Sequence, residues 1–356
     1  MVEIDPQTSF SVIKVLSLSA IAFIVSIFFT PFLTNFLYKH KLWKKTSRTT
    51  SIDGKKMPVF QKFHSEKEVK VPRFGGVLIW IIPPVLAVIF FILSVVDGNI
   101  LDKMNFLSRS QTWLPLFAMV AASLVGLTDD LFQVRGRGKY VGGGLSLKYR
   151  LACVFLIGLI GGWWFYAKLG WATLHIPGAG DIYMGFWYIP FFVLIMLAVY
   201  AGGVIDGLDG LAGGSFSAIF SAFAVIALFR GQIDLAAFCA VVAGTILAFL
   251  WFNIPPARFY MGESATMGLC TALTVVAFLT DSVLVLPIIG ILLVAEAGSV
   301  IIQLLSKKFF KKKIFIATPI HYHFEGKGWP HYKITMRFWV IGLIAAVIGI
   351  AIRLLG

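Results

Sequence analysis

Five carboxylate side chains stand where long apolar runs of this chain end. They are Asp129, Asp130, Asp206, Asp209 and Glu263. An acidic residue at the end of a membrane segment is uncommon and costly, so such a group is typical of a site that binds cations or handles protons. All five can be placed on one membrane face, and that face also carries most of the 31 Lys and Arg residues. Both signs of charge on one face predict a metal-assisted reaction on an anionic substrate.

The adjacent pair Asp129-Asp130 directly follows the apolar run VAASLVGLT. Neighbouring residues of a helix point about 100° apart, so both carboxylates can face one cavity without facing each other. Two carboxylates this close suit Mg²⁺ binding, or a general base whose pKa is tuned by its neighbour. The alternative is a solvated helix end without a chemical role.

The string Asp206-Gly-Leu-Asp209-Gly-Leu-Ala-Gly-Gly is the most specific one in the chain. Its spacing of three predicts that both carboxylates lie on one side of a helical turn. The glycines allow a ligand to approach the backbone closely, and they would bend or break a spanning helix at this level. A glycine-hinged structural turn is the alternative, but it leaves the two acidic residues unexplained.

A second polar string, Asn253-Ile-Pro-Pro-Ala-Arg-Phe-Tyr260-Met-Gly-Glu263, connects one apolar run with the next. Tyr260 could stack on a base and Asn253 could hydrogen-bond to one. Glu263 could ligate a metal ion, because carboxylate oxygens are ligands for hard cations. The two adjacent prolines indicate only that a helix ends there.

The last basic loop contains the string His321-Tyr-His323-Phe-Glu325. Two histidines and a glutamate could form a Zn²⁺ site, but no cysteine or third histidine stands beside them in this string. Contact with phosphate is therefore the favoured interpretation, and a solvated basic loop is the alternative. Glu296 lies inside an apolar run, where a carboxylate is either a functional group or a partner in a structural hydrogen bond.

The elements that must position these residues are membrane helices. The chain of 356 residues is 58% hydrophobic, and its mean hydropathy is +0.87. This composition excludes a soluble domain and predicts an all-α polytopic integral membrane protein. A span needs about 20 apolar residues. On that basis we predict about ten transmembrane helices, at 14–38, 75–96, 112–128, 149–168, 187–205, 212–229, 233–252, 264–280, 284–304 and 335–354.

The polar residues between the spans form no separate domain. We therefore predict a single transmembrane domain over 1–356, with active-site loops at 39–73, 129–148, 206–211, 253–263 and 305–334. The stretch 169–186 on the opposite face mixes β-forming residues with Pro and Gly, which favours a short hairpin.

The distribution of basic residues predicts the orientation. Most Lys and Arg residues fall in the loops that also carry the acids, and basic loops stay in the cytoplasm. Both termini are then on the outer face, and the acidic group is cytoplasmic. The net charge of +14 is explained by this topology signal and by anionic lipid headgroups. No aromatic-basic module indicates nucleic-acid binding.

The chain resembles the polyprenyl-phosphate N-acetylhexosamine-1-phosphate transferases over nearly its whole length. The resemblance rests on the strings GLTDD, DGLDGLAGG, FLWFNIPPARFYMGE and TPIHYHFEGKGWP, in that order, and on a last span that opens RFWVIGLI. That family has ten spans and outside termini, in agreement with the topology predicted from the apolar runs.

The resemblance implies a catalytic group that includes His321 and a Mg²⁺ site at Asp129, Asp130 and Glu263. Either Asp129 or Asp130 would deprotonate the lipid phosphate. His321 and His323 would lie near the diphosphate and the sugar of the donor. The remaining matches line a uridine pocket, with Glu296 at a polar position: Asp206, Gly207, Leu208, Asp209, Asn253, Tyr260 and Glu296.

The C-terminal string HYHFEGKGWP, followed by RFW, favours the branch of the family that makes lipid I for peptidoglycan. Members of that branch transfer phospho-MurNAc-pentapeptide from UDP-MurNAc-pentapeptide to undecaprenyl phosphate and release UMP. The resemblance implies these substrates, Mg²⁺, a surrounding lipid bilayer and a homodimer. The expected location is the bacterial cytoplasmic (inner) membrane, as a multi-pass protein with a cytoplasmic active site.

Several positions depart from that branch. Glu263 replaces an aspartate, Gln133 a lysine, Tyr322 the middle histidine of three, and Gly203 an asparagine. The string VPRFGG is similar to the PR-x-GG of the branch that uses UDP-GlcNAc, which is therefore the alternative substrate. A cation-coupled transporter is a distant alternative from another class. It predicts inverted repeats and acids at the midplane, and the sequence shows no repeat.

Overall fold

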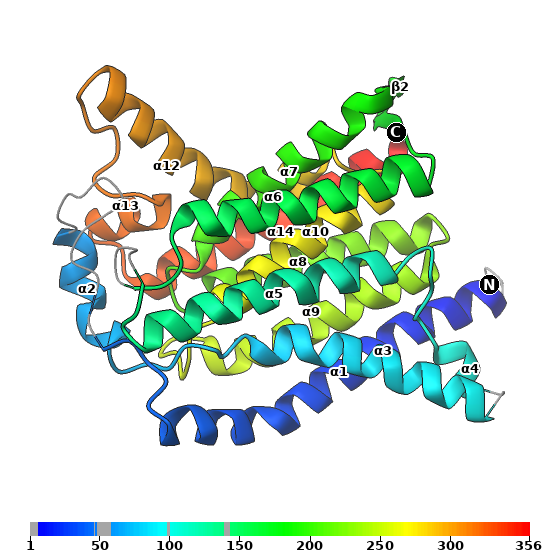
Figure 1. Cartoon of the computed structure of the whole chain (residues 1–356), viewed down its shortest axis with the longest axis horizontal. Helices are drawn as coiled ribbons and strands as arrows, with labels where there is room; N and C mark the ends of the chain where they lie inside the picture. The colour runs from blue at the N-terminus through cyan, green and yellow to red at the C-terminus, as the bar shows by residue number, and fades with distance from the viewer. Residues whose placement is uncertain (1–5, 46, 48–57, 98–99, 139–142) are drawn as a thin grey trace.

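The structure is a computed structural model that describes residues 6–45, 47, 58–97, 100–138 and 143–356 (Figure 1). Helices make up most of it, because a chain in lipid must satisfy its backbone hydrogen bonds internally. The helices are α1 (Pro6–Lys39), α2 (Pro58–Glu68), α3 (Val77–Asp97), α4 (Ile100–Met104), α5 (Trp113–Val134), α6 (Leu147–Trp163), α7 (Tyr188–Gly202), α8 (Leu211–Phe229), α9 (Ile233–Asn253), α10 (Glu263–Leu279), α11 (Leu286–Ile289), α12 (Ile291–Phe309), α13 (Ile320–Gly326) and α14 (His331–Leu355).

Short elements complete the described chain. A π-helical turn (Trp164–Lys168) extends α6, and 3-10 turns precede and follow α7 (Gly185–Trp187 and Gly203–Ile205). The strands β1 (Thr173–Ile176) and β2 (Gly180–Tyr183) pair antiparallel, with Thr173 opposite Tyr183. The hairpin expected in 169–186 is therefore confirmed.

Eight of the described helices are long and apolar enough to cross a membrane. This confirms a helical, multi-pass membrane protein. The helix predicted at 264–280 is present as α10, and its 17 residues make it shorter than the eight long helices. The span predicted at 284–304 is divided at Gly290 into α11 and α12, and α12 carries Glu296 and two lysines.

The predicted boundary at residue 128 was wrong. Helix α5 continues to Val134, so Asp129 and Asp130 lie in its last two turns and not in a loop. The apolar run ended at Thr128, but a helix whose end faces protein can continue through polar residues as long as they find partners. The acidic pair is consequently held on a rigid element.

The outward faces of the bundle are apolar. Side chains such as Phe28 of α1 (63% exposed) and Val347 of α14 (66% exposed) face away from the protein. Exposed apolar surface of this extent along several helices is typical of contact with lipid. The interior is built around α9 and α10, and every residue of α10 from Ser264 to Leu279 is buried. A helix enclosed by protein does not have to match the bilayer thickness, which explains why α10 can be short.

Both chain ends lie at the same end of the bundle, together with the hairpin, while α2 and α13 lie at the opposite end (Figure 1). The prediction that the termini share one face agrees with this arrangement. The assignment of that face to the outside stays a prediction.

Helices α5 and α10 approach each other closely at Gly126. A Cβ atom on Gly126 would lie 2.2 Å from the carbonyl oxygen of Glu263 and 2.7 Å from Ser264 Cα. Small residues allow two membrane helices to bring their backbones together in this way. Asp130 is one helical turn beyond Gly126, so the close approach brings its carboxylate to the start of α10.

Gly126→Ala is expected to destabilise the protein by about 1–3 kcal/mol, because the backbone atoms of α10 cannot move aside as a side chain can. Thermal unfolding in detergent measures this effect. Gly298→Ala is the matched control, since a Cβ atom on Gly298 of α12 meets no other described atom within 4 Å. Equal melting temperatures for the two variants would contradict the close approach.

Candidate active site

The side chain of Asp130, which belongs to α5, lies against the N-terminus of α10. Its Oδ1 accepts the backbone N–H of Glu263 (3.2 Å), and its Oδ2 accepts that of Ser264 (2.9 Å). The side chain is fully buried, and Arg73 Nε lies 3.3 Å from Oδ1. The first N–H groups of a helix have no partner within the helix and favour a negative charge. Asp130 therefore caps α10 from a neighbouring helix and fixes where Glu263 stands.

Asp129 and Glu263 converge on the guanidinium group of Arg150. Arg150 Nη1 is 2.5 Å from Glu263 Oε1 and 3.8 Å from Asp129 Oδ2. Asp129 also accepts hydrogen bonds from Gln133 Nε2 (2.6 Å) and from the Leu145 N–H. Asp129 is buried, whereas 26% of the Glu263 side chain is exposed. The two carboxylates thus share the positive charge of Arg150, and of the two only Glu263 is accessible to solvent.

Asp206 binds the same turn from another side. Its Oδ2 accepts the N–H of Gly262 at 3.2 Å. Burial raises the pKa of Asp206 to about 6, and the charge of Arg73 opposes the shift. Asp130 and Asp206 together hold the backbone at 262–264, next to Arg73. We refer to Asp129, Asp130, Asp206 and Glu263 as the carboxylate cluster.

Arg73 reaches the cluster because its segment pairs with the backbone before α10. The N–H of Tyr260 donates to Pro72 O (2.8 Å), and the N–H of Gly75 donates to Tyr260 O (2.9 Å). The N–H of Gly76 continues the pairing to Met261 O (3.1 Å). The segment 72–76 is therefore held as a short ladder along 260–261.

Asn253 joins the two polar strings of the site. Its Oδ1 accepts the N–H of Gly210 (2.9 Å), and its Nδ2 donates to Phe259 O (2.8 Å). Asp209 Oδ2 accepts the N–H of Ala257 at 3.2 Å. Residues 206–210 form turns rather than a helical turn, so the prediction that Asp206 and Asp209 share one helical side was wrong. The glycines let the backbone bend, and each carboxylate binds a different part of the 257–262 segment.

His321 and Glu296 form a buried pair. His321 Nδ1 is 2.8 Å from Glu296 Oε2, and neither side chain has exposed area. His321 Nε2 has no partner among the described residues, and a Cβ atom on Gly207 would lie 2.3 Å from it. Nε2 thus faces the backbone of the turn that carries Asp206. Glu296, placed inside a predicted span, fixes the orientation of this ring.

His323 does not join His321. Its Nδ1 accepts the N–H of Ile316, and burial, with the charge of Lys327, lowers the pKa of its ring. In α13 the two histidines are two residues apart, so they point about 200° apart. Tyr322, between them, donates a hydrogen bond from its hydroxyl to Gly207 O at 3.3 Å.

Tyr260 and Leu208 line the same region. The Tyr260 side chain is half-buried, and burial raises the pKa of its hydroxyl, which therefore stays neutral. Leu208 is 5% exposed and belongs to the core, and Gly207 next to it contacts Tyr322 and His321. A stacking role for Tyr260 stays a prediction.

Two residues of the candidate site were not predicted from the sequence. Arg73 was noted only as part of VPRFGG, and Arg150 lies within the span predicted at 149–168. Both are buried and pair with carboxylates of the cluster. A buried arginine is almost always paired, but nothing in its local sequence says with which residue.

The cluster has the donor set that a hard divalent cation requires. Asp129 and Glu263 offer carboxylate oxygens that already converge on one positive group. Gln133 Oε1, beside Asp129, is buried and has no hydrogen-bond partner among the described residues. Oxygen ligands of this kind suit Mg²⁺. Asp130 fits less well as a ligand, because both of its oxygens accept backbone N–H groups.

Comparison with known proteins identifies relatives along almost the whole chain. Residues 112–281 match the model of glycosyl transferase family 4. A phospho-N-acetylmuramoyl-pentapeptide-transferase of Geobacillus sp. (strain WCH70) is 35% identical over 296 residues, which are 81% of this chain and 85% of the relative. Proteins of the same name from Geobacillus thermodenitrificans and Listeria welshimeri are each 32% identical. These alignments cover 94% and 96% of this chain, and 96% and 99% of the relatives.

Proposed function

We propose that this chain transfers phospho-MurNAc-pentapeptide from UDP-MurNAc-pentapeptide to undecaprenyl phosphate. The reason is that the chain belongs to the phospho-N-acetylmuramoyl-pentapeptide-transferase family. The products are lipid I, for peptidoglycan biosynthesis, and UMP. The observation that carries the proposal is the carboxylate cluster at one end of the helices. In it, Asp129 and Glu263 converge on the guanidinium group of Arg150. Such a site suits a donor with a diphosphate group and an acceptor with a phosphate group.

The site belongs at the boundary between membrane and cytoplasm. A lipid phosphate sits at the headgroup level, whereas a nucleotide sugar is soluble, so the catalyst must open to both. The basic loops favour the cytoplasmic face of the bacterial cytoplasmic membrane for this site. The outer location of both termini and a homodimeric state are parts of the same proposal.

In the proposed reaction, an oxygen of the lipid phosphate attacks the phosphorus that carries the sugar. The bond from this phosphorus to the bridging oxygen breaks, and UMP leaves with the electron pair. Asp129 and Glu263 would hold Mg²⁺, which supplies charge neutralisation at the diphosphate when it is bound. Arg73 and Arg150 add fixed positive charge, and His321 Nε2 is available to donate a hydrogen bond to a phosphate oxygen.

Direct transfer is favoured over a covalent aspartyl intermediate. Both oxygens of Asp130 accept backbone N–H groups, and both oxygens of Asp129 accept hydrogen bonds as well. A nucleophile needs an oxygen that is free to approach phosphorus. We therefore assign Asp130 to holding α10. Asp129 would hold the cation, because the donor to its Oδ2 is the side-chain amide of Gln133, which can rotate away, and not a backbone N–H.

Release of UMP tests the proposed function. The purified protein in detergent, with Mg²⁺ and undecaprenyl phosphate, is offered UDP-MurNAc-pentapeptide and UDP-GlcNAc in separate assays. We expect release with the first only. Release with UDP-GlcNAc alone would overturn the substrate assignment and favour the branch suggested by VPRFGG. Release with neither would overturn the reaction.

We expect activity to fall as the pH decreases through about 6, because the carboxylate of Asp206 then becomes protonated. Arg73 stabilises the ionised form, so Arg73→Gln will raise the pKa of Asp206 and shift the acidic limb of the kcat/KM profile to higher pH. Arg258→Gln is the control, since its guanidinium group lies over the Phe252 ring. If neither variant moves the limb, Asp206 is not the titrating group.

A further inference from the structure

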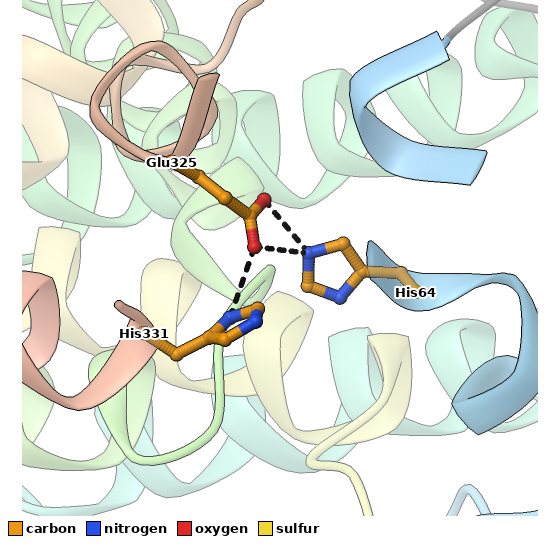
Figure 2. A group of neighbouring side chains, drawn as sticks. All are labelled: His64, Glu325 and His331. Carbon is orange, nitrogen blue, oxygen red and sulfur yellow. Dashed lines mark hydrogen bonds and ion pairs between the residues drawn. The ribbon is translucent and has the colours of Figure 1, made fainter. Parts of the chain in front are cut away.

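Three side chains with metal-binding atoms meet outside the carboxylate cluster. They are His64 of α2, Glu325 of α13 and His331, the first residue of α14 (Figure 2). His64 Nε2 lies 2.9 and 3.0 Å from the two oxygens of Glu325, and His331 Nδ1 lies 3.0 Å from Oε1. Their residues are far apart in the sequence, so only the fold brings them together.

We propose that His64, Glu325 and His331 form a binding site for a transition-metal ion of the Zn²⁺ class. Two imidazole nitrogens and one carboxylate are a ligand set that holds Zn²⁺ and leaves a fourth position open. The ligand atoms all lie within 4.8 Å of one another. In a tetrahedral Zn²⁺ site with bonds of about 2.0 Å, neighbouring ligand atoms are about 3.3 Å apart. The side chains therefore need to separate only slightly to admit the ion.

The surroundings of the three residues support a built site. Glu325 and His64 are nearly enclosed, with 1% and 12% of their side chains exposed. The His64 ring stacks on Phe60 and meets the edge of Tyr322, which fixes its orientation. His331 is 29% exposed, so an ion or a fourth ligand can enter from its side.

A cavity adjoins the cluster on the Glu325 side. Its volume is about 270 Å³, and its lining includes Lys62, Phe63, Glu325 and Gly328. The space is large enough for hydrated ions. Its lining includes neither histidine, so the exposed side of His331 is the route to the ligand atoms.

The alternative is an ion pair in which Glu325 accepts hydrogen bonds from two histidines. In that arrangement, protons lie between the histidines and Glu325, in the place of the proposed metal ion. Metal binding would displace these protons, because an imidazole must be neutral to bind a metal ion. The nitrogen ligands distinguish this site from the carboxylate cluster. Mg²⁺ prefers oxygen ligands, whereas imidazole suits Zn²⁺ and Co²⁺.

A metal ion here would join three helices near the active site. Tyr322 contacts His64 on one side and donates to Gly207 O on the other. Fixing α13 against α2 and α14 would therefore also fix His321 against the turn that contains Asp206. The site would stabilise the arrangement without taking part in the reaction.

The full chain, purified without a polyhistidine tag, provides the test. It is loaded with Zn²⁺ or Co²⁺, desalted and analysed for retained metal by mass spectrometry and for the visible absorption of Co²⁺. We expect about one equivalent of retained metal per chain and a tetrahedral Co²⁺ spectrum. His331→Gln and Glu325→Gln should weaken binding at least about tenfold.

Two histidine variants control for other sites. His40→Gln changes an exposed histidine outside the cluster, and His175→Gln changes a second group that contains Asp181 and Asp281. In that group the guanidinium group of Arg353 lies 3.3 Å from His175 Nε2, and its positive charge disfavours a metal ion there. Both control variants should retain metal like the wild type.

Thermal unfolding separates loss of the site from loss of the fold. Zn²⁺ should raise the melting temperature of the wild type and of His40→Gln, but not that of His331→Gln. His331→Gln should also unfold cooperatively without metal, because the residue is partly exposed. Failure of the wild type to retain metal, or equal retention by His331→Gln and Glu325→Gln, would overturn the proposal.

Discussion

Glu263→Gln is expected to lower the rate of UMP release by about a hundredfold or more. The reason is that charge stabilisation by a metal ion is worth several kcal/mol in the transition state. The substitution keeps the shape of the side chain. It removes one of the two carboxylates that contact Arg150, and this is the one that is accessible to solvent. The Mg²⁺ concentration that gives half-maximal activity should rise at the same time. A titration of UMP release against Mg²⁺ measures both effects.

Two further substitutions sharpen this test. Glu263→Asp should retain activity, since it keeps the charge and has the ligand type expected for the family. Glu66→Gln should have no effect, because the Glu66 side chain is 88% exposed in α2. An unchanged Mg²⁺ titration for Glu263→Gln would move the metal site away from the carboxylate cluster.

Asp130→Asn should abolish turnover and also destabilise the fold, by about 1–3 kcal/mol. Its two oxygens accept the N–H groups of Glu263 and Ser264, and the amide of asparagine would turn its own N–H₂ group towards one of these donors. Neither backbone donor can reverse its role, so a buried N–H loses its partner. UMP release and thermal unfolding, measured on one preparation, should fall together.

Asp129→Asn provides the contrast. It should also abolish turnover, but the melting temperature should stay close to that of the wild type. The partner of Asp129 Oδ2 is the side-chain amide of Gln133, whose Oε1 has no other partner among the described residues. That amide can rotate and present its oxygen to the new N–H₂ group. Near-normal turnover in both variants would remove the acidic pair from the mechanism.

The fold was predictable where contact with lipid determines the secondary structure. Long apolar runs have to become helices in a bilayer, so most spans were located correctly from hydropathy. The run at 284–304 was predicted as one span, but it breaks at Gly290, and the hydropathy of the run does not indicate that break.

The site was predictable in its residue types but not in its pairings. The acidic strings were recognised, and Asp129, Asp130, Asp206 and Glu263 do come together. Arg73 and Arg150 were missed because an ion pair between distant segments leaves no spacing in the sequence. The string around His321 was considered for Zn²⁺ and set aside for want of a third histidine. The structure brings His64 and His331 to Glu325, while His321 and His323 point elsewhere.

The ladder between 72–76 and 260–261 restricts some of its side chains and leaves others unrestricted. Its hydrogen bonds are all main-chain bonds, so they do not depend on the side chain at position 73. Gly75 and Gly76 are the restricted positions, because Cβ atoms there would lie 2.1 Å from the Phe259 ring and 2.4 Å from Ala265 Cβ. Residue 73 can therefore be exchanged on an unchanged backbone, which separates its ion pair with Asp130 from the scaffold that carries it.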